Sequence, residues 1–137
     1  MNRIEFCNLM EQAKIESGVR SSDISFSMKM LSPVLWRFEK GKHNFSLIKV
    51  MEYLNVINHQ IVIYNGSSEY KCKSYDKLIT WLVTKRGKTY SQQQLSDIIS
   101  MSRSTIAKIE TQKTVLGIDV FLKIIEVLGY ELKIESL

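Results

Sequence analysis

Hydrophobic positions along this chain recur with an offset of 71 residues. From residue 20 to residue 64, the apolar positions of the first half fall on those of the second half without a gap. The matched pairs are Ile24 with Leu95, Met28 with Ile99, Met30 with Met101, Leu35 with Ile106 and Phe38 with Ile109. Their helical spacing predicts two short helices and an intervening turn in each half, with one inward face.

A third helix is predicted after this pair in each half. The stripe Leu47, Val50, Met51, Leu54 and Ile57 matches Ile118, Phe121, Leu122, Ile125 and Leu128, and each set lies on one helix face. Asn58 and Gly129 follow, and both residue types readily adopt the left-handed conformation that ends a helix. Strand patterns come next, at residues 59–64 and 130–135.

Each repeat is preceded by an amphipathic pattern that predicts a helix, at residues 3–17 and 75–86, with Gly18 and Gly87 ending them. The apolar residues of the two helices align as Phe6, Leu9, Met10 and Ala13 with Tyr75, Leu78, Ile79 and Leu82. This alignment requires two extra residues near Lys88 and Thr89 in the second half. Between the halves, Asn65-Gly66 favours a type I′ hairpin turn, so residues 67–74 are either a returning strand or a linker.

The predicted fold class is mainly all-α. We expect two tandem units, residues 1–66 and residues 67–137, each ending in a short strand, and these strands can pair into a small sheet. A chain of 137 residues suits two small helical units that fold with help from each other.

Charge adds one indication about partners. The net charge is +5, with 8 basic against 6 acidic residues in positions 1–66 and 11 against 8 in positions 67–137. Both halves can therefore face a polyanion, although a charge that only keeps the protein in solution would look the same. The apolar runs are too short for a membrane span and the N-terminus is charged, so we expect a cytoplasmic protein with no membrane partner.

Residues that carry catalysis or bind metals are sparse. Cys7 and Cys72 lack metal or redox spacing and are expected to be ordinary reduced side chains. His43 and His59 lie far from either cysteine in the sequence, and we expect both on the surface. We predict no metal, no cofactor and no enzymatic activity.

A helix, a tight turn and a second short helix with a polar outer face form the helix-turn-helix arrangement, whose second helix enters the DNA major groove. The stretch SQQQLSDIISMSRSTIAKIETQK, residues 91–113, resembles the lambda-repressor-like or XRE family of helix-turn-helix proteins. Residues 39–56 resemble the segment of that family that follows the recognition helix. The resemblance implies a sequence-specific double-stranded DNA-binding transcriptional regulator of bacterial or phage type.

The resemblance also implies which residues of the second unit bind DNA. Gln92 and Ser102 would hold phosphates, Lys113 would add a phosphate contact, and Arg103, Ser104, Thr105 and Lys108 would face the groove. Physical chemistry agrees, because Ser102 can cap a helix whose amide groups attract phosphate, and Arg103 can reach guanine with two hydrogen bonds.

The corresponding surface of the first unit departs from the family pattern. It consists of Ser32, Pro33, Val34, Trp36 and Arg37, followed by Lys40, Lys42 and His43. Trp36 aligns with Ala107 on the outer face. It either stacks on a sugar or a thymine methyl group, packs on a protein partner, or turns inward and fills the core.

In the family, an acidic residue at the end of the recognition helix pairs with a basic residue of the first helix. Glu39 and Glu110 occupy this position, and Lys14 is placed to meet Glu39. The alignment puts Val83 opposite Lys14, so Glu110 would reach Lys85 or Arg86, or stay solvated. In the loop that follows this helix, the second half has Gln112 where the first half has Gly41. The loop of the second half is therefore expected to depart slightly from the family geometry.

Two functions follow from these patterns. In the first, the strand Ile61–Tyr64 pairs with the strand Leu132–Glu135, and the two units form a monomeric pseudo-dimer on DNA; a conventional homodimer is the rival assembly. In the second, the protein is a DNA-binding antitoxin, because helix-turn-helix units that end in a short strand, as in LGYELKIE, also resemble antitoxins of the HipB type. The first unit would then mainly bind a toxin or another protein partner.

Overall fold

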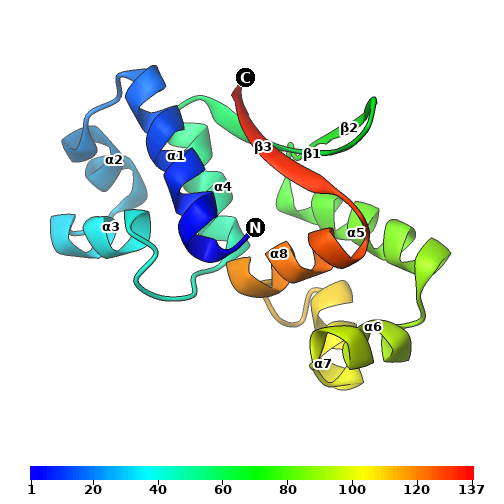
Figure 1. Ribbon diagram of the computed structural model, residues 1–137. Coiled ribbons are helices and arrows are strands. Elements are labelled where there is room, and N and C mark those ends of the chain that lie inside the picture. The colour runs from blue at the N-terminus through cyan, green and yellow to red at the C-terminus, as the bar shows by residue number, and fades with distance from the viewer.

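The computed structural model describes residues 1–137 as eight helices and one small antiparallel sheet (Figure 1). The first-half elements are α1 (Arg3–Ser17), α2 (Ser21–Met28), α3 (Ser32–Glu39), α4 (Leu47–Val56) and β1 (His59–Asn65). The remaining elements are β2 (Ser68–Lys71), α5 (Tyr75–Thr89), α6 (Gln92–Ile99), α7 (Arg103–Glu110), α8 (Ile118–Val127) and β3 (Glu131–Ser136). The mainly helical fold class is confirmed. None of the eight helices combines the length and the apolar composition that a membrane span requires.

The sequence repeat reappears in the bounds of the helices. α2 and α6, α3 and α7, and α4 and α8 begin and end at positions 71 apart. The residues with positive φ repeat as well, namely Lys29 with Ser100, Asn58 with Gly129 and Gly41 with Gln112. Gln112 has φ 60° where Gly41 has φ 65°, so the loop keeps its conformation despite the lost glycine.

The first helices of the two units follow a different offset from the one predicted. α1 and α5 are both 15 residues long and start 72 positions apart, so no residues are inserted near Lys88. The alignment of Phe6 with Tyr75 was therefore wrong by three residues. A shift of three nearly preserves the face of a 3.6-residue helix, so the apolar pattern alone fits both alignments.

Gly87 does not end its helix. α5 continues to Thr89, and Gly87 is absent from the residues with positive φ, whereas Gly18 ends α1 in the left-handed conformation. A glycine inside a helix costs only about 1 kcal/mol, which the packing of α5 against the core offsets.

The sheet joins the two units. β1 lies between β2 and β3, and its antiparallel register with β3 pairs Ile61 with Ile134 and Ile63 with Leu132. The predicted pairing of these two strands is confirmed. β2 returns alongside β1, so residues 68–71 form a strand and not a linker.

The hairpin between β1 and β2 differs in its turn. Asn65 still pairs with Ser68, so Gly66 and Ser67 form the loop, and of these two only Gly66 has positive φ. A type I′ turn requires positive φ at both central residues, so that part of the prediction was wrong. Asn65 continues the β1 ladder instead of entering the turn.

Two pairings join residues that are equivalent in the repeat. Val62 pairs with Lys133 in the sheet, and Ser46 forms an isolated antiparallel bridge with Gly117. Around the bridge, the Leu47 N–H donates to the Leu116 carbonyl at 2.9 Å, and the Ile118 N–H donates to the Phe45 carbonyl at 2.8 Å. The two bonds are equivalent in the repeat, because Leu47 corresponds to Ile118 and Phe45 corresponds to Leu116.

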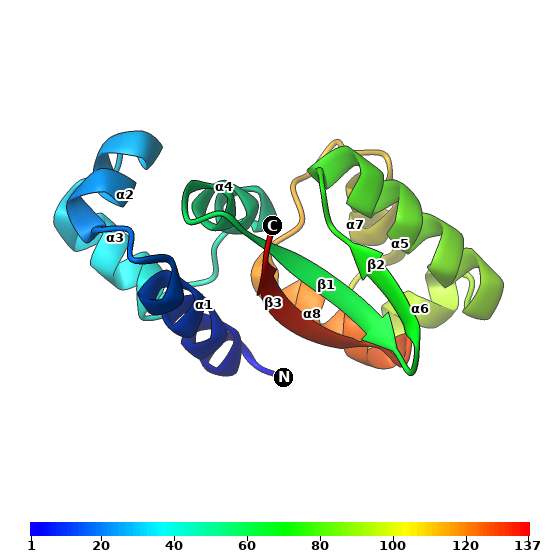
Figure 2. The same cartoon turned by 90° about the horizontal axis from the view of Figure 1, so that it is seen from above.

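The two helix pairs α2–α3 and α6–α7 lie at opposite ends of the molecule, with the sheet between them (Figure 2). One hydrophobic core of 31 buried residues runs through both units. The apolar stripes predicted for α2, α3 and α4 and for their counterparts pack in this core, with only Met30, Met51, Met101 and Leu128 partly exposed.

His59 is buried, with 6% of its surface exposed, so its predicted surface position was wrong. It begins β1, where side chains alternate between faces, and it shares the inward face with Ile61 and Ile63. Its Nδ1 atom lies 2.7 Å from the Ile57 carbonyl oxygen. His43 is exposed, as predicted.

Candidate DNA-binding surface

Serine caps define the starts of α6 and α7. The Ser91 hydroxyl accepts a hydrogen bond from the Gln94 N–H at 3.1 Å, and the Gln94 side chain accepts one from the Ser91 N–H at 2.8 Å. The Ser102 hydroxyl accepts from the Thr105 N–H at 3.1 Å. Both caps fix the first turn of their helix and leave its outer face polar.

The inward face of α7 leaves a definite outer stripe. Ile106 and Ile109 are buried in the core, so Ser104, Ala107 and Lys108 lie on the opposite side of the helix at positions i, i+3 and i+4. Of the predicted groove residues, Arg103, Ser104 and Lys108 are exposed and Thr105 is partly buried, with its hydroxyl 2.7 Å from that of Ser102.

The positive charges of this surface are free of internal partners. Arg103, Lys108 and Lys113 form no ion pair within the chain, and all three are exposed. No acidic residue lies in the first turn of α7. The start of α7 therefore presents positive charge and a helix N-terminus together, a combination that attracts phosphate.

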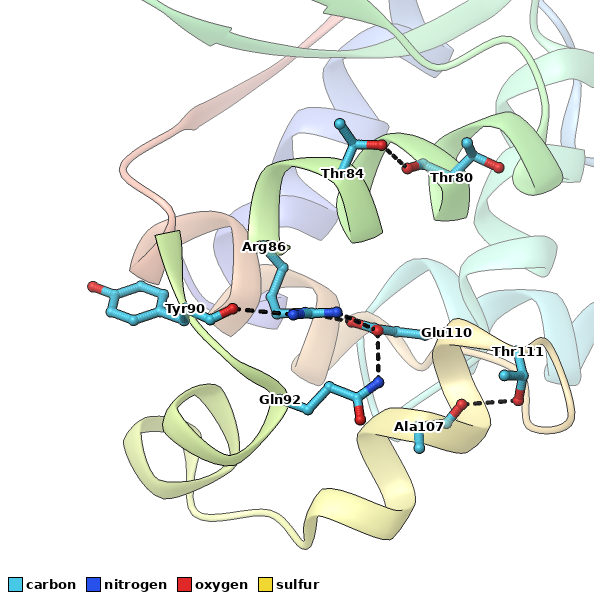
Figure 3. Close-up of polar contacts among 8 residues, drawn as sticks. All are labelled: Thr80, Thr84, Arg86, Tyr90, Gln92, Ala107, Glu110 and Thr111. Atoms are coloured by element: carbon cyan, nitrogen blue, oxygen red, sulfur yellow. Dashed lines mark hydrogen bonds and ion pairs between the residues drawn. The ribbon is translucent and has the colours of Figure 1, made fainter. Parts of the chain in front are cut away.

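A partly buried ion pair between Arg86 and Glu110 links α7 to α5 (Figure 3). Arg86 donates from Nε and Nη2 to the Glu110 carboxylate at 2.8 and 2.7 Å, and from Nη1 to the Tyr90 carbonyl at 3.0 Å. The bonds to Glu110 raise the pKa of the Arg86 guanidinium above its ordinary value. Of the partners predicted for Glu110, Arg86 is the one found.

Gln92 joins the same network. Its side-chain amide donates to Glu110 at 2.9 Å, so α5, α6 and α7 meet at one carboxylate (Figure 3). The amide nitrogen carries two hydrogens, and only one is used in this bond. The other makes no hydrogen bond within the chain, and the phosphate contact of Gln92 stays a prediction.

The first unit has an equivalent ion pair, formed by different residues. Lys14 lies 2.8 Å from Glu39, as predicted, and the buried Tyr53 hydroxyl donates to Glu39 at 2.5 Å. Lys14 and Arg86 are 72 positions apart, the offset of α1 and α5, which corrects the earlier match of Lys14 with Val83. Sequence reasoning missed Tyr53; its only signal was the equivalent position Ile124, which is also buried.

The outer face of the first unit lacks the serine caps. Leu31 takes the place of Ser102 and Arg20 that of Ser91, and neither makes a side-chain capping bond. Apart from Trp36, the predicted contact residues of this unit are all exposed, namely Ser32, Arg37, Lys40 and Lys42.

Trp36 lies outside the core, with 53% of its surface exposed, so of the three alternatives for its side chain the inward one is wrong. Leu35 and Phe38 already fill the inward face of α3, which leaves Trp36 on the outer side. The Lys42 ammonium lies 5.6 Å from the Trp36 ring centroid.

A comparison with known families gives a match in the second unit. Residues 85–134 match the family model HTH_3, described as helix-turn-helix, and the match spans α6, α7, α8 and most of β3. Neither the curated proteins nor the solved structures compared with the chain gave a match. The second unit is thus similar to XRE-type helix-turn-helix domains, which supports a DNA-binding regulator in general.

Proposed function

We propose that this protein is a sequence-specific, double-stranded DNA-binding transcriptional regulator whose two units act as a fused pair on one DNA site. The observation that carries the proposal is the pairing of Val62 with Lys133 and of Ser46 with Gly117. Each pairing joins a residue to its equivalent in the repeat. Two identical chains make such contacts at a two-fold axis, and here both come from one chain.

A fused pair meets a geometric need of these domains. One helix-turn-helix unit reads only a few base pairs, and dimers place two recognition helices about 34 Å apart on one face of the duplex. In the fused pair, α3 and α7 supply the two recognition helices. A single chain would therefore cover two half-sites.

The two half-sites should not be equivalent. α7 presents Arg103, Ser104 and Lys108, which hydrogen-bond to base edges or phosphates, whereas the same surface of α3 includes Pro33 and Trp36. We therefore expect one half-site to be specified by polar contacts from α7 and the other to differ from it in sequence.

A DNA-binding antitoxin of the HipB type is the second candidate. The exposed Trp36 favours it, because an exposed aromatic side chain beside other apolar residues is typical of protein interfaces. Under this reading the first unit adds nothing to DNA affinity, and deleting its surface residues leaves DNA binding unchanged.

Selection of bound duplexes from random DNA tests the proposal, followed by titration of the selected site at several salt concentrations. We expect an asymmetric two-part motif, and an affinity whose logarithm falls linearly with the logarithm of salt, by about 0.9 per phosphate neutralised. A flat salt response, or no enrichment over random sequence, would contradict the proposal.

A further inference from the structure

Apolar side chains lie on the face of the first unit that corresponds to the DNA-facing surface of the second. Leu31 is 77% exposed and Trp36 is 53% exposed, and Pro33 between them is exposed as well. Their equivalents 71 positions later are Ser102, Ala107 and Ser104. The two units thus share a backbone but differ in the chemistry of this surface.

The helix geometry places these residues on the outer side of α3. Leu35 and Phe38 are buried, and Pro33, Trp36 and Arg37 lie opposite them at positions i, i+3 and i+4. The same stripe of α7 holds Ser104, Ala107 and Lys108. In a fused pair, Trp36 therefore lies where a recognition helix meets base edges.

Positive charge lies next to Trp36, since the Lys42 ammonium is 5.6 Å from its ring centroid. Arg37 and Lys42 are exposed and form no ion pair within the chain. The nearby acidic residues are neutralised, since Glu39 lies 2.8 Å from Lys14 and Glu11 lies 3.6 Å from Lys40. A polyanion with an apolar group between its charges fits this surface.

The start of α3 offers fewer hydrogen-bond donors than the start of α7, with the exposed Ser32 as the one hydroxyl in its first turn. Leu31 has no hydroxyl where the second unit has Ser102, and Pro33 has no N–H. The Val34 N–H already donates to the Leu31 carbonyl at 3.0 Å. Ser32 and Arg37 remain as polar groups on this surface, and the apolar side chains add contacts that the polar surface of α7 lacks. The C5-methyl of thymine is the apolar group in the major groove that such side chains can contact.

We propose that the first unit reads thymine methyl groups through Leu31, Pro33 and Trp36, while Arg37 and Lys42 bind the flanking phosphates. This inference rests on the proposed function and adds the base class that the first unit recognises. The half-site of the first unit is then defined by thymine, and that of the second unit by the polar contacts of Arg103.

Replacing thymidine with deoxyuridine tests this directly, because it removes the methyl group and keeps base pairing. The half-site of the second unit is first located as the one whose base preference is relaxed by Arg103→Ala. Deoxyuridine in the other half-site should weaken binding about fourfold per contacted methyl, equivalent to the ~0.8 kcal/mol of one buried methylene-sized group.

Two variants assign the effect to the outer stripe of α3. The first is Trp36→Ala, a change at an exposed position. In this variant the affinity for the thymidine duplex divided by that for the deoxyuridine duplex should fall most of the way to 1. Phe26→Asp is the matched control, because Phe26 is 86% exposed, lies on α2, and has Asp97 as its equivalent. This control should leave the ratio unchanged.

Some results would overturn the inference while keeping the proposed function. Equal affinity of the wild-type protein for thymidine and deoxyuridine duplexes is one, and it would favour a protein partner for this surface. Another is an equal fall of the thymidine-to-deoxyuridine affinity ratio toward 1 in Phe26→Asp and in Trp36→Ala. If no duplex binds at all, the proposed function itself fails.

Discussion

Arg103 and Lys113 lie on one surface but at opposite ends of α7. Arg103 is the first residue of the helix, and Lys113 follows its last residue by three positions. Arg103→Ala should relax base preference at one position of the site and cost about 1–3 kcal/mol of binding free energy on the selected duplex. Lys113→Ala should weaken selected and random duplexes alike, because a phosphate contact carries no sequence information. Titrations of both variants on both duplexes check this; equal small losses throughout would contradict the assignment.

Single residues also show what a sequence can predict. The cap at Ser102 was predictable because serine is a preferred residue at the N-cap of a helix. Arg103 was expected to be exposed because Ile106 and Ile109 define the inward face of the helix. His59 was not predictable from its polarity, since its place in the strand alternation buries it. The outward position of Trp36 depends on Leu35 and Phe38 filling the core first, which is a matter of packing.

At the scale of the elements, the loops that follow α3 and α7 differ in backbone strain. Gly41 and Gln112 both adopt positive φ, a conformation that costs a side-chain-bearing residue about 1 kcal/mol or more. Gln112→Gly should therefore raise the free energy of unfolding by about 0.5–1 kcal/mol.

Gly41→Ala is the converse variant and should lower the free energy of unfolding. Its new Cβ would lie 3.1 Å from both the Cys7 sulfur and the Ile4 Cδ1 atom, in addition to the strain at φ +65°. Urea titrations of the two variants beside the wild type give the comparison. A destabilised Gln112→Gly protein would refute this account of the loop.

Helices and strands differ in how far the apolar pattern determined them. The presence and order of α2, α3 and α4 and of their counterparts followed from the ungapped repetition of apolar positions over residues 20–64. The alignment of α1 with α5 failed because a helix tolerates a shift of three residues with little change of face. The ion pairs of Lys14 and Arg86 decide that alignment, and they become visible only when α3 and α7 are in place.

At the scale of the whole molecule, the continuous core and the shared sheet should make the two units unfold together. Each unit contains one tryptophan: Trp36 lies on the surface of the first, and Trp81 stacks on Tyr70 at 4.9 Å in the second. Single-tryptophan variants, Trp36→Phe and Trp81→Phe, report on one unit each. Their urea transitions followed by fluorescence should coincide with each other and with the loss of helical circular dichroism. Two separated transitions would mean that the sheet does not couple the units.

The pairing of β1 with β3 could be predicted because both strands follow equivalent helices in the repeat and both carry apolar residues, Ile61 and Ile63 in β1 and Leu132 in β3. A pseudo-two-fold orientation of the two units was part of the pseudo-dimer prediction, whereas the residues that pair across it, Val62 with Lys133 and Ser46 with Gly117, could not be predicted, because an apolar repeat does not fix the strand register. That orientation decides whether one chain or two are needed for one DNA site.

Sedimentation velocity at micromolar concentration, on the protein alone and with a short duplex carrying one selected site, tests the fused pair most directly. The account predicts a monomer in the absence of DNA and a complex of one chain with one duplex. An obligate dimer that requires two chains, and hence four units, on the same duplex would contradict it.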